Sequence, residues 1–314
     1  MTTYIEILNR YKVGVLAGGP SNERRVSLRS GEAVSKALVS AGIDRVILLD
    51  VTEEDFDDII HESGIDIAFI ALHGRFGEDG TVQRALEKME IPYTGSRPES
   101  SALALDKLSS RAHFIDNGLD APDYMVVRRG QDISELDIWL PCVVKPRFEG
   151  SSIGLSIVKS EAELIAAVDK AFAFGEEVII EKFIHGREIT VGILAEKPLP
   201  VVEIEARGGV YDFEAKYEAE TTKYIVPAEL SKKEYLLAQD TALKAHRAIG
   251  CRGFSRVDMR LSAEERMYVL EVNTIPGLTQ RSLFPMAAEA AGVDFPLLCV
   301  IMLYGALNEN MEIW

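Results

Sequence analysis

Apolar runs alternate with helical patterns along the first 97 residues. Three short runs read as buried strands, at residues 12–17, 45–49 and 66–72. Residues 27–41 repeat apolar positions at a helical period and stop at Gly42. Strands that alternate with helices predict an α/β domain with a parallel sheet, whose ligands lie at the carboxyl ends of the strands. Gly18, Gly19 and His73 follow two of these strands.

From residue 98 the pattern becomes α+β, and we expect three domains, at residues 1–97, 98–184 and 185–314. The second has helices that begin at Asp106 and Ser160, with strands at residues 142–146 and 177–183. The third combines strands at residues 188–194, 200–205, 255–261 and 267–273 with helices at residues 231–249, 282–291 and 295–307. Residues 206–224 form a connection whose length is typical of a functional or disordered loop.

Two neighbouring strands of the third domain share a polar face. Period-two alternation places Arg256 and Asp258 on one side of the first strand, and Glu271 and Asn273 on one side of the second. If residues 263–266 form the turn, antiparallel pairing sets Asp258 opposite Glu271 and Arg256 opposite Asn273. Two carboxylates about 5 Å apart repel each other by roughly 3 kcal/mol at an effective dielectric constant of about 20.

A divalent cation removes that repulsion, and two carboxylates with an amide suit Mg²⁺ or Mn²⁺. Leu270 and Val272 are expected behind the polar face, against a core. The alternative is a solvated outer face with ordinary surface charges. The metal site is favoured because Asn273 leads directly into residues 274–279, an uncharged stretch whose glycine lets the backbone approach a ligand closely.

The formal net charge of −16 over 314 residues argues against a nucleic-acid or anionic-membrane surface. A phosphate-bearing ligand therefore has to meet a local cluster of lysines and arginines. The three cysteines lie far apart, in or beside apolar runs, and are expected to be reduced core residues. We expect a cytoplasmic protein, because no signal-like stretch opens the chain and the longest apolar run, near residues 295–307, is shorter than the ~18 residues of a membrane span.

Small residues follow the predicted strand that ends in Lys145 and Pro146. Residues 150–154, Gly-Ser-Ser-Ile-Gly, allow backbone N–H groups and hydroxyls to close over phosphate oxygens while Lys145 supplies charge. The alternative for these residues is an ordinary turn. The chain lacks both the P-loop pattern G-x-x-x-x-G-K-[ST] and the dinucleotide pattern G-x-G-x-x-G.

Four acidic or histidine side chains are candidates for ligand contacts, and each has a plainer alternative. Glu181 is placed to accept from the exocyclic amine of a purine and Glu188 to accept from ribose hydroxyls, or both are charges at a strand end. Glu23 is placed to hold a substrate ammonium, or it is an acid favoured by a helix dipole. His73 is a pocket donor or a structural residue. No Ser, Cys or His has the flanking pattern of a catalytic triad.

Several stretches in this order resemble the D-alanine:D-alanine ligase family of the ATP-grasp superfamily, from Val13 to about Leu307. The most specific are residues 18–23, 26–27, 71–74, 77–81, 93–96, 149–154, 215–217 and 271–279. The resemblance implies an ATP-grasp fold preceded by an N-terminal α/β substrate domain, with ATP between the second and third domains. It also implies D-alanine and ATP as partners and a homodimer, without nucleic-acid or membrane partners.

The resemblance assigns nucleotide contacts to particular side chains. Phosphate contacts are Lys107, Lys145, Ser151 and Ser152. Adenine contacts are Glu181, Lys182, Phe183 and Ile184, and the ribose contact is Glu188. Two Mg²⁺ ions, or Mn²⁺, would be held by Asp258, Glu271 and Asn273, with Glu271 bridging both. The local positive cluster would then consist of Lys107, Lys145, Lys182, Lys216 and Arg256.

The resemblance implies the reaction as well. One D-alanine carboxylate attacks the γ-phosphate to give an acyl phosphate, and the amine of a second D-alanine then displaces phosphate. Arg256 and the N–H of Gly277 would stabilise the oxyanion of the tetrahedral intermediate. The implied substrate contacts are Glu23 and His73 for the first D-alanine, and Lys216, Ser282 and Leu283 for the second.

A contact between Glu23, Ser151 and Tyr217 is expected to lock the long connection over the site. Tyr217 favours a dipeptide product, whereas Phe148 and Arg281 depart from the family pattern, so D-lactate and D-serine stay alternative second substrates. A nucleotide-binding module without catalysis is an alternative of a different class, and it requires the loss of a metal ligand or a phosphate lysine. None is missing, and we expect an ATP-dependent ligase that makes D-alanyl-D-alanine for peptidoglycan synthesis.

Overall fold

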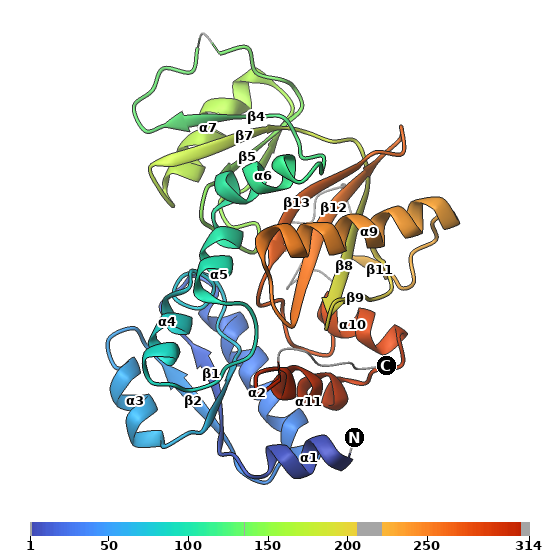
Figure 1. The fold of residues 1–314 in the computed structure, drawn as a ribbon. Coiled ribbons are helices and arrows are strands. Elements are labelled where there is room, and N and C mark those ends of the chain that lie inside the picture. The colour runs from blue at the N-terminus through green and yellow to red at the C-terminus, as the bar shows by residue number, and fades with distance from the viewer. Residues whose placement is uncertain (1, 135, 206–221, 309–314) are drawn as a thin grey trace.

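The computed structural model describes residues 2–134, 136–205 and 222–308, and its strands form three sheets in three parts of the molecule (Figure 1). The first sheet is parallel, as predicted, with the strand order β2-β1-β3. Its strands and following helices are β1 (Val13–Gly18), α2 (Arg24–Ser40), β2 (Val46–Val51), α3 (Phe56–Ser63), β3 (Ile67–Ile70) and α4 (Thr81–Lys88). Because β1 is central and adjacent to β3, the segments that follow these two strands meet at one edge of the sheet.

The second sheet is antiparallel, with the order β4-β7-β5-β6. Its elements are β4 (Tyr124–Arg128), β5 (Cys142–Pro146), β6 (Ser156–Val158), α7 (Glu161–Phe172) and β7 (Glu177–Lys182). The sequence predicts α7, β5 and β7 but not β4 or β6. The short β6 and the half-buried β4 lack a clear apolar alternation, and pairing with the buried β5 and β7 holds them in place.

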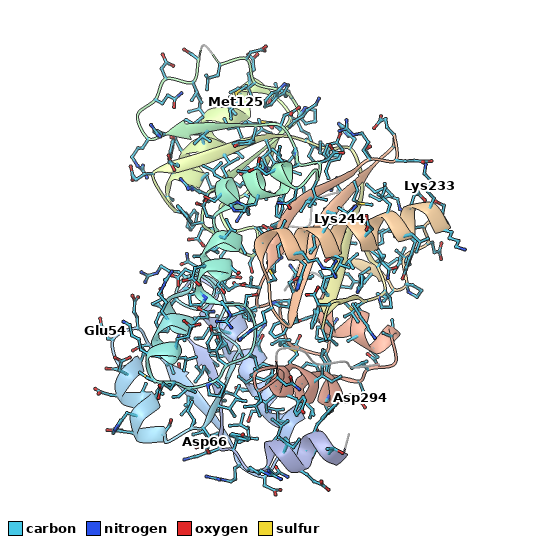
Figure 2. The ribbon with its side chains drawn as sticks, in the orientation of Figure 1. Glu54, Asp66, Met125, Lys233, Lys244 and Asp294 are labelled. Carbon is cyan, nitrogen blue, oxygen red and sulfur yellow. The ribbon has the colours of Figure 1, made fainter. Side chains whose placement is uncertain are left out.

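The third sheet has the order β11-β10-β8-β12-β13, with β9 paired to β8. Its elements are β8 (Gly186–Leu194), β9 (Lys197–Pro198), β10 (Val202–Glu205), β11 (Lys223–Ile225), α9 (Lys232–Ile249), β12 (Phe254–Ser262) and β13 (Met267–Asn273). A capping box of Ser231 and Glu234 starts α9, and the left-handed Gly250 ends it. Exposed side chains such as Lys233 and Lys244 cover its outer face (Figure 2). The prediction of a loop through residue 224 was wrong at its end, because β11 pairs with β10.

Helices α5 (Pro98–Leu105) and α6 (Lys107–Asp116) precede the second sheet in the chain but pack against the third. Ala104 and Phe114 belong to the same apolar core as Val257 and Met259 of β12. The side chain of Asp106 accepts from the first backbone N–H groups of α6, so this helix begins at a fixed point. Its first residue is Lys107, which therefore lies between the second and third sheets.

Helix α10 (Leu283–Ala290) follows the third sheet and packs against its strand β8, while helix α11 (Phe295–Gly305) packs against α2 and α1 (Thr2–Leu8) (Figure 1). Phe284 and Leu303 share one apolar core with Val15 and Val34. Within the described part of the chain no single helix is long and apolar enough to cross a membrane; α10 and α11 reach that length only together, across a bend of 104°. The three domain limits stay a prediction.

Candidate functional site

The polar face of the β12–β13 hairpin has the expected pairing at its functional end. Asp258 lies opposite Glu271, and Arg256 lies opposite Asn273. The turn lies at residues 263–266, between β12 and β13, as predicted. Beside it the register is shifted by one residue, because Leu261 rather than Ser262 lies opposite Met267.

A β-bulge at Leu270 brings the two strands back into the predicted pairing. Asp258 pairs with Glu271 while Met259 pairs with Val269, which leaves Leu270 as the extra residue. Leu270 is half-buried and lines a pocket, so the prediction that it packs against the core was wrong. The bulge therefore turns both Leu270 and Glu271 toward the same side.

Two cations lie beside the two hairpin carboxylates. Arg256 donates twice to Asp258, at 2.8 and 2.7 Å, and Asn273 Nδ2 donates to Asp258 Oδ2 at 3.1 Å. Lys107 Nζ lies 3.8 Å from Glu271 Oε2. The repulsion expected between the carboxylates is thus reduced by positive side chains.

The hairpin donors fit a hard divalent cation by their chemistry. Asp258 and Glu271 supply carboxylate oxygens and Asn273 an amide oxygen, all on half-buried side chains, and the two carboxylates line a pocket. Among the residues that the structure describes, no group of three or more His, Cys, Asp and Glu side chains is gathered as a metal site. Further ligands would therefore have to come from water or phosphate oxygens.

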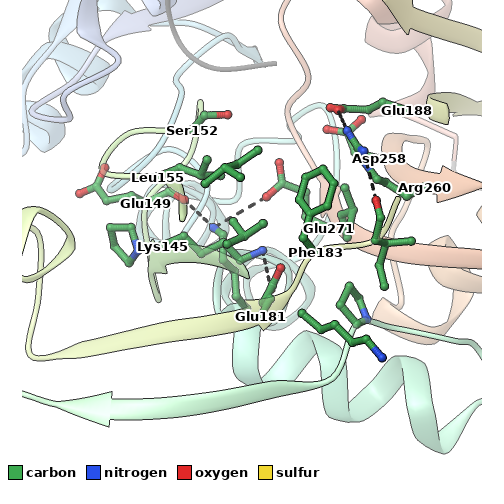
Figure 3. A pocket seen from close by; sticks show the side chains of 18 of the residues that line it. Lys145, Glu149, Ser152, Leu155, Glu181, Phe183, Glu188, Asp258, Arg260 and Glu271 are labelled. Carbon is green, nitrogen blue, oxygen red and sulfur yellow. Dashed lines mark hydrogen bonds and ion pairs between the residues drawn. The ribbon is translucent and has the colours of Figure 1, made fainter. Parts of the chain in front are cut away.

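A pocket lies between the second and third sheets (Figure 3). Ten of the residues predicted for nucleotide or metal line it. They are Lys107, Lys145, Ser152, Glu181, Lys182, Phe183, Ile184, Glu188, Asp258 and Glu271. Some of these residues precede the segment that joins β7 to β8 in the sequence, others follow it, and Phe183 and Ile184 belong to it.

Glu181 lies at the floor of this pocket, only 2% exposed, between two cations. Lys145 Nζ lies 2.6 Å from Glu181 Oε1, and Arg111 donates to the same oxygen. Burial raises the pKa of Glu181, but Lys145 and Arg111 outweigh it and hold that pKa below its ordinary value. The carboxylate expected to accept from a purine amine is therefore paired with two cations, and a contact of residue 181 with adenine stays a prediction.

Burial lowers the pKa of Lys145, and the neighbouring Arg111 and Lys107 lower it further, against the opposing effect of Glu181. Lys107 donates to the backbone carbonyl of Glu149 at the start of the small-residue loop. Two lysines and an arginine are thus held within reach of one another despite their like charge. Such a cluster is the local positive site that an acidic chain needs for a phosphate ligand.

The small-residue loop has a strained backbone. Ser151 and Ser152 both have left-handed conformations, with φ of 47° and 58°. Non-glycine residues in this region cost on the order of 1–3 kcal/mol each and gather at functional sites. Ser152 lines the pocket, while the Ser151 hydroxyl donates to Glu23. This geometry favours a ligand loop over an ordinary turn.

Glu23 lies between two glycines from different parts of the chain. A Cβ on Gly74 would lie 2.7 Å from Glu23 Oε2, and one on Gly150 would lie 2.6 Å from it. Glycine at both positions therefore leaves room for the carboxylate. Two members of the predicted locking contact, Glu23 and Ser151, meet; the third, Tyr217, and the substrate candidate Lys216 lie outside the described residues.

His73 is buried and engaged at both ring nitrogens. Nδ1 lies 3.1 Å from the carbonyl of Ile275, and Nε2 lies 3.0 Å from the Ser30 hydroxyl. A carbonyl only accepts, so Nδ1 carries the proton and Nε2 accepts from Ser30. Burial lowers the pKa of His73 to about 4, against the bond to Ile275, so the ring is neutral near pH 7. Both nitrogens are bonded to protein groups, and a contact with substrate stays a prediction.

Glu78 was not among the predicted site residues. Its carboxylate accepts from the N–H of Gly74 at 2.7 Å and from the N–H of Ile275 at 3.4 Å. Burial, and then the nearby Glu23 carboxylate, raise the pKa of Glu78 well above its ordinary value, while Arg256 opposes them. The first sheet and the segment after β13 are thus tied together beside Glu23 and Arg256.

The segment after β13 leads from Asn273 to the start of α10. The Ser282 hydroxyl accepts from the N–H of Thr279 at 3.2 Å, and a Cβ on Gly277 would lie 3.0 Å from that hydroxyl. The side chain of Leu283 is buried in the core, so any substrate contact of this residue has to come from its backbone. The contacts predicted for Gly277 and Ser282 stay predictions.

Arg111 and Arg260 are the other site residues that the sequence did not reveal. Signals existed for both. Arg111 follows Lys107 by one helical turn, and Arg260 continues the alternation of Arg256 and Asp258 on β12.

Comparisons with known proteins agree with this geometry. Two family models match, one described as D-ala D-ala ligase C-terminus over residues 114–304 and one as D-ala D-ala ligase N-terminus over residues 50–96. The chain is 46% identical to D-alanine–D-alanine ligase of Syntrophotalea carbinolica, over 95% of this chain and 97% of that relative. It is 49% identical to D-alanine–D-alanine ligase of Pelobacter propionicus, over 91% of this chain and 92% of that relative.

Two solved structures are similar over nearly their full length. One is D-alanine–D-alanine ligase from Bacillus anthracis complexed with ATP, at 34% identity and a TM-score of 0.81, covering 95% of this chain and 97% of that one. The other is the VanG D-Ala:D-Ser ligase from Enterococcus faecalis, at 30% identity and a TM-score of 0.78, covering 93% of this chain and 98% of that one.

Proposed function

Because the chain belongs to the D-alanine–D-alanine ligase family, we propose that its pocket binds ATP and that the enzyme joins two D-alanine molecules. A carboxylate oxygen of the first D-alanine bonds to the γ-phosphorus as the bond to ADP breaks. The amine of the second attacks the acyl carbon of the resulting acyl phosphate, loses a proton, and phosphate leaves. The products are D-alanyl-D-alanine, ADP and phosphate, and the dipeptide serves peptidoglycan precursor synthesis.

The observation that carries this proposal is the juxtaposition of Lys107 and Lys145 with the hairpin carboxylates Asp258 and Glu271 around one pocket. Phosphoryl transfer needs positioning and charge neutralisation more than covalent chemistry by the protein. The two lysines orient the phosphates from one side, and Ser152 and the backbone of its loop close over them. Glu188 accepts from the ribose, and the segment around Ile184 meets the adenine.

Asp258, Glu271 and Asn273 would hold Mg²⁺ or Mn²⁺ at the phosphate end of the pocket. Divalent cations there would offset charge on the transferring phosphoryl group. The protein's own part is to hold the ligand side chains in place. Arg256 and Thr190 hold the Asp258 carboxylate by hydrogen bonds of 2.7–2.8 Å.

The amino-acid substrates lie beside the first sheet in this proposal. Glu23 takes the ammonium of the first D-alanine, while Arg256 and the N–H of Gly277 stabilise the oxyanion that forms on its carboxyl group. Tyr217 favours an amine over a hydroxyl nucleophile, so the dipeptide is the expected product. The remaining contacts proposed are those of His73, Lys216, Ser282 and Leu283 with the two substrates.

A D-alanyl-D-serine product is the second candidate, because the fold is also similar to a D-Ala:D-Ser ligase at 30% identity. Steady-state phosphate release with ATP and D-alanine, alone and with added D-serine or D-lactate, together with chromatographic identification of the product, separates the candidates. We expect turnover with D-alanine alone, and D-alanyl-D-alanine as the main product in mixtures. A dominant mixed product at neutral pH would overturn the dipeptide assignment. We also propose the three domains given above and a homodimer, which light scattering at micromolar concentration tests.

The metal contact is tested by Glu271→Gln, which keeps the side-chain shape and removes its charge. We expect turnover to fall by a factor of about a hundred or more and the Mg²⁺ concentration at half-maximal rate to rise, since the charge stabilisation that a bound metal ion supplies is worth several kcal/mol. Glu264→Gln, in the loop of the same hairpin, is the matched control and should keep wild-type rates. Turnover of Glu271→Gln near that of the control would mean that Glu271 holds no metal.

A further inference from the structure

The charged side chains of β12 are Arg256, Asp258 and Arg260. Arg260 is the one expected near the base and ribose of the nucleotide rather than near its phosphates. Only 9% exposed, it lies directly across from Glu188 on the neighbouring strand β8. Its Nη2 donates to Glu188 Oε2 at 2.9 Å, and its Nη1 donates to the carbonyl of Ile184 at 3.2 Å (Figure 3). The guanidinium carbon lies 5.0 Å from the centre of the Phe183 ring.

These contacts join two parts of the pocket that would otherwise be independent. Phe183 and Ile184 belong to the segment that connects β7 of the second sheet to β8 of the third. Glu188 lies further along, inside β8. A planar guanidinium has donors in a fixed fork, so the carbonyl and the carboxylate are held at a set distance and orientation. A lysine or an apolar residue cannot hold both in this way.

The pair is also electrostatically favourable at this place. Glu188 and Arg260 are mostly buried, with side-chain exposures of 18% and 11%. A mostly buried carboxylate would be costly without a partner. Arg260 holds one carboxylate oxygen of Glu188 in place, and a carboxylate accepts hydrogen bonds from hydroxyl groups.

We propose that Arg260 is a positioning residue for the nucleotide, which holds Glu188 and the Ile184 carbonyl so that the site selects a ribose over a deoxyribose. The proposal rests on the proposed function, in that ATP occupies this pocket with its ribose at Glu188. Arg260 does not contact the reacting atoms. It sets the affinity for ATP and leaves the chemical steps, and the affinity for D-alanine, unchanged.

Steady-state kinetics of the full-length enzyme with ATP, 2′-deoxy-ATP and 3′-deoxy-ATP test this role. In Arg260→Met we expect the KM for ATP to rise about tenfold or more, because a hydrogen bond to a charged group is worth a factor of this size. One of the two deoxynucleotides lacks the hydroxyl group that would donate a hydrogen bond to Glu188. Its KM should rise less than about threefold in Arg260→Met. The kcat and the KM for D-alanine should stay within about twofold of wild type.

Two further variants separate positioning from general damage. Arg260→Lys keeps the charge but not the fork, and we expect an intermediate KM for ATP. Arg187 lies beside Glu188 on β8 and forms a bidentate pair with Glu203 of β10, outside the pocket. Arg187→Met removes this pair and should leave the KM values for ATP, 2′-deoxy-ATP and 3′-deoxy-ATP at wild type. Thermal unfolding of each variant reports on folding independently of turnover.

An unchanged KM for ATP in Arg260→Met, or equal KM increases for all three nucleotides, would overturn the proposal. If Arg260→Met does not fold, the same comparison is made with Arg260→Lys, and equal increases there have the same meaning. Absence of phosphate release by the wild-type enzyme with ATP and D-alanine would instead contradict the proposed function. The two failures are thus distinguishable.

Discussion

Arg111→Met removes one of the two cations that hold the buried Glu181 carboxylate. Arg111 is 2% exposed, and its guanidinium carbon also lies 4.7 Å from the centre of the Tyr124 ring. A hydrogen bond to a charged group contributes about 1.5–3 kcal/mol, and a desolvated cation–π contact up to about 2 kcal/mol. Lys145 remains 2.6 Å from Glu181, so the larger cost of an unpaired buried carboxylate is avoided. We expect the free energy of unfolding to fall by about 3 kcal/mol.

Urea unfolding followed by circular dichroism measures this change. Arg266→Met is the matched control, because Arg266 lies 5.3 Å from the Tyr268 ring and pairs with Asp120 at 2.7 Å, but on the surface. Its side chain is 56% exposed, so its loss should cost less than about 1 kcal/mol. The two variants thus remove the same kind of contact at different burial.

Arg111→Met should also weaken ATP binding. Without Arg111, Lys145 is the only remaining partner of Glu181 among its described ion pairs, and it is drawn toward that carboxylate and away from a phosphate. We expect a KM for ATP several-fold above wild type, with the KM for D-alanine unchanged. If Arg111→Met and Arg266→Met lost the same stability to within about 0.5 kcal/mol, the reasoning from burial would be refuted.

Two further predictions concern the substrate side of the site. The pKa of His73 is lowered from 6.5 to about 4, so between these pH values the unfolded chain binds a proton that the folded chain does not, and stability is lost as pH falls from 6.5 to 4. In His73→Gln this loss of stability should be smaller by about 3 kcal/mol. Urea unfolding at each pH measures it. In Gly150→Ala the new Cβ would lie 2.6 Å from Glu23 Oε2 and displace it, so the KM for D-alanine should rise about tenfold with little change in thermal unfolding. Gly175→Ala, whose Cβ meets no atom within 4 Å, should behave as wild type, and a KM equal to that control would speak against Glu23 as a substrate contact.

The hairpin shows how far alternation alone leads. It predicts both the turn at residues 263–266 and the pairing of Asp258 with Glu271 correctly. Between them the register is shifted by one residue, with Met259 opposite Val269, and the bulge at Leu270 restores the predicted pairing. Local sequence did not reveal the bulge, because leucine suits a core position as well as a pocket wall, and only the pairing with β12 decides which side it takes.

The contacts of Arg111 and Arg260 depend on how elements far apart in the chain are placed. Arg111 reaches Glu181 from a helix that packs on the third sheet, while Glu181 belongs to the second. Arg260 donates to Glu188 on the neighbouring strand β8 and to the Ile184 carbonyl in the segment that joins those sheets. Residue type and spacing mark both as polar positions on an element, but their partners follow only from the packing of α6 and β12.

The basic and acidic side chains of the pocket nearly cancel, so its lysines alone would not offset the negative charge of a nucleotide. Its described lining has four basic and five acidic side chains, namely Lys107, Lys145, Lys182 and Arg260 against Glu149, Glu181, Glu188, Asp258 and Glu271. Arg111 and Arg256, which pair with Glu181 and Asp258, leave the group with a single excess positive charge. A triphosphate brings several negative charges into this half-buried space, where repulsion is weakly screened. The same carboxylates that would repel it are the ligands that divalent cations prefer, so in the proposed function the acidic hairpin would favour ATP binding only together with a divalent cation.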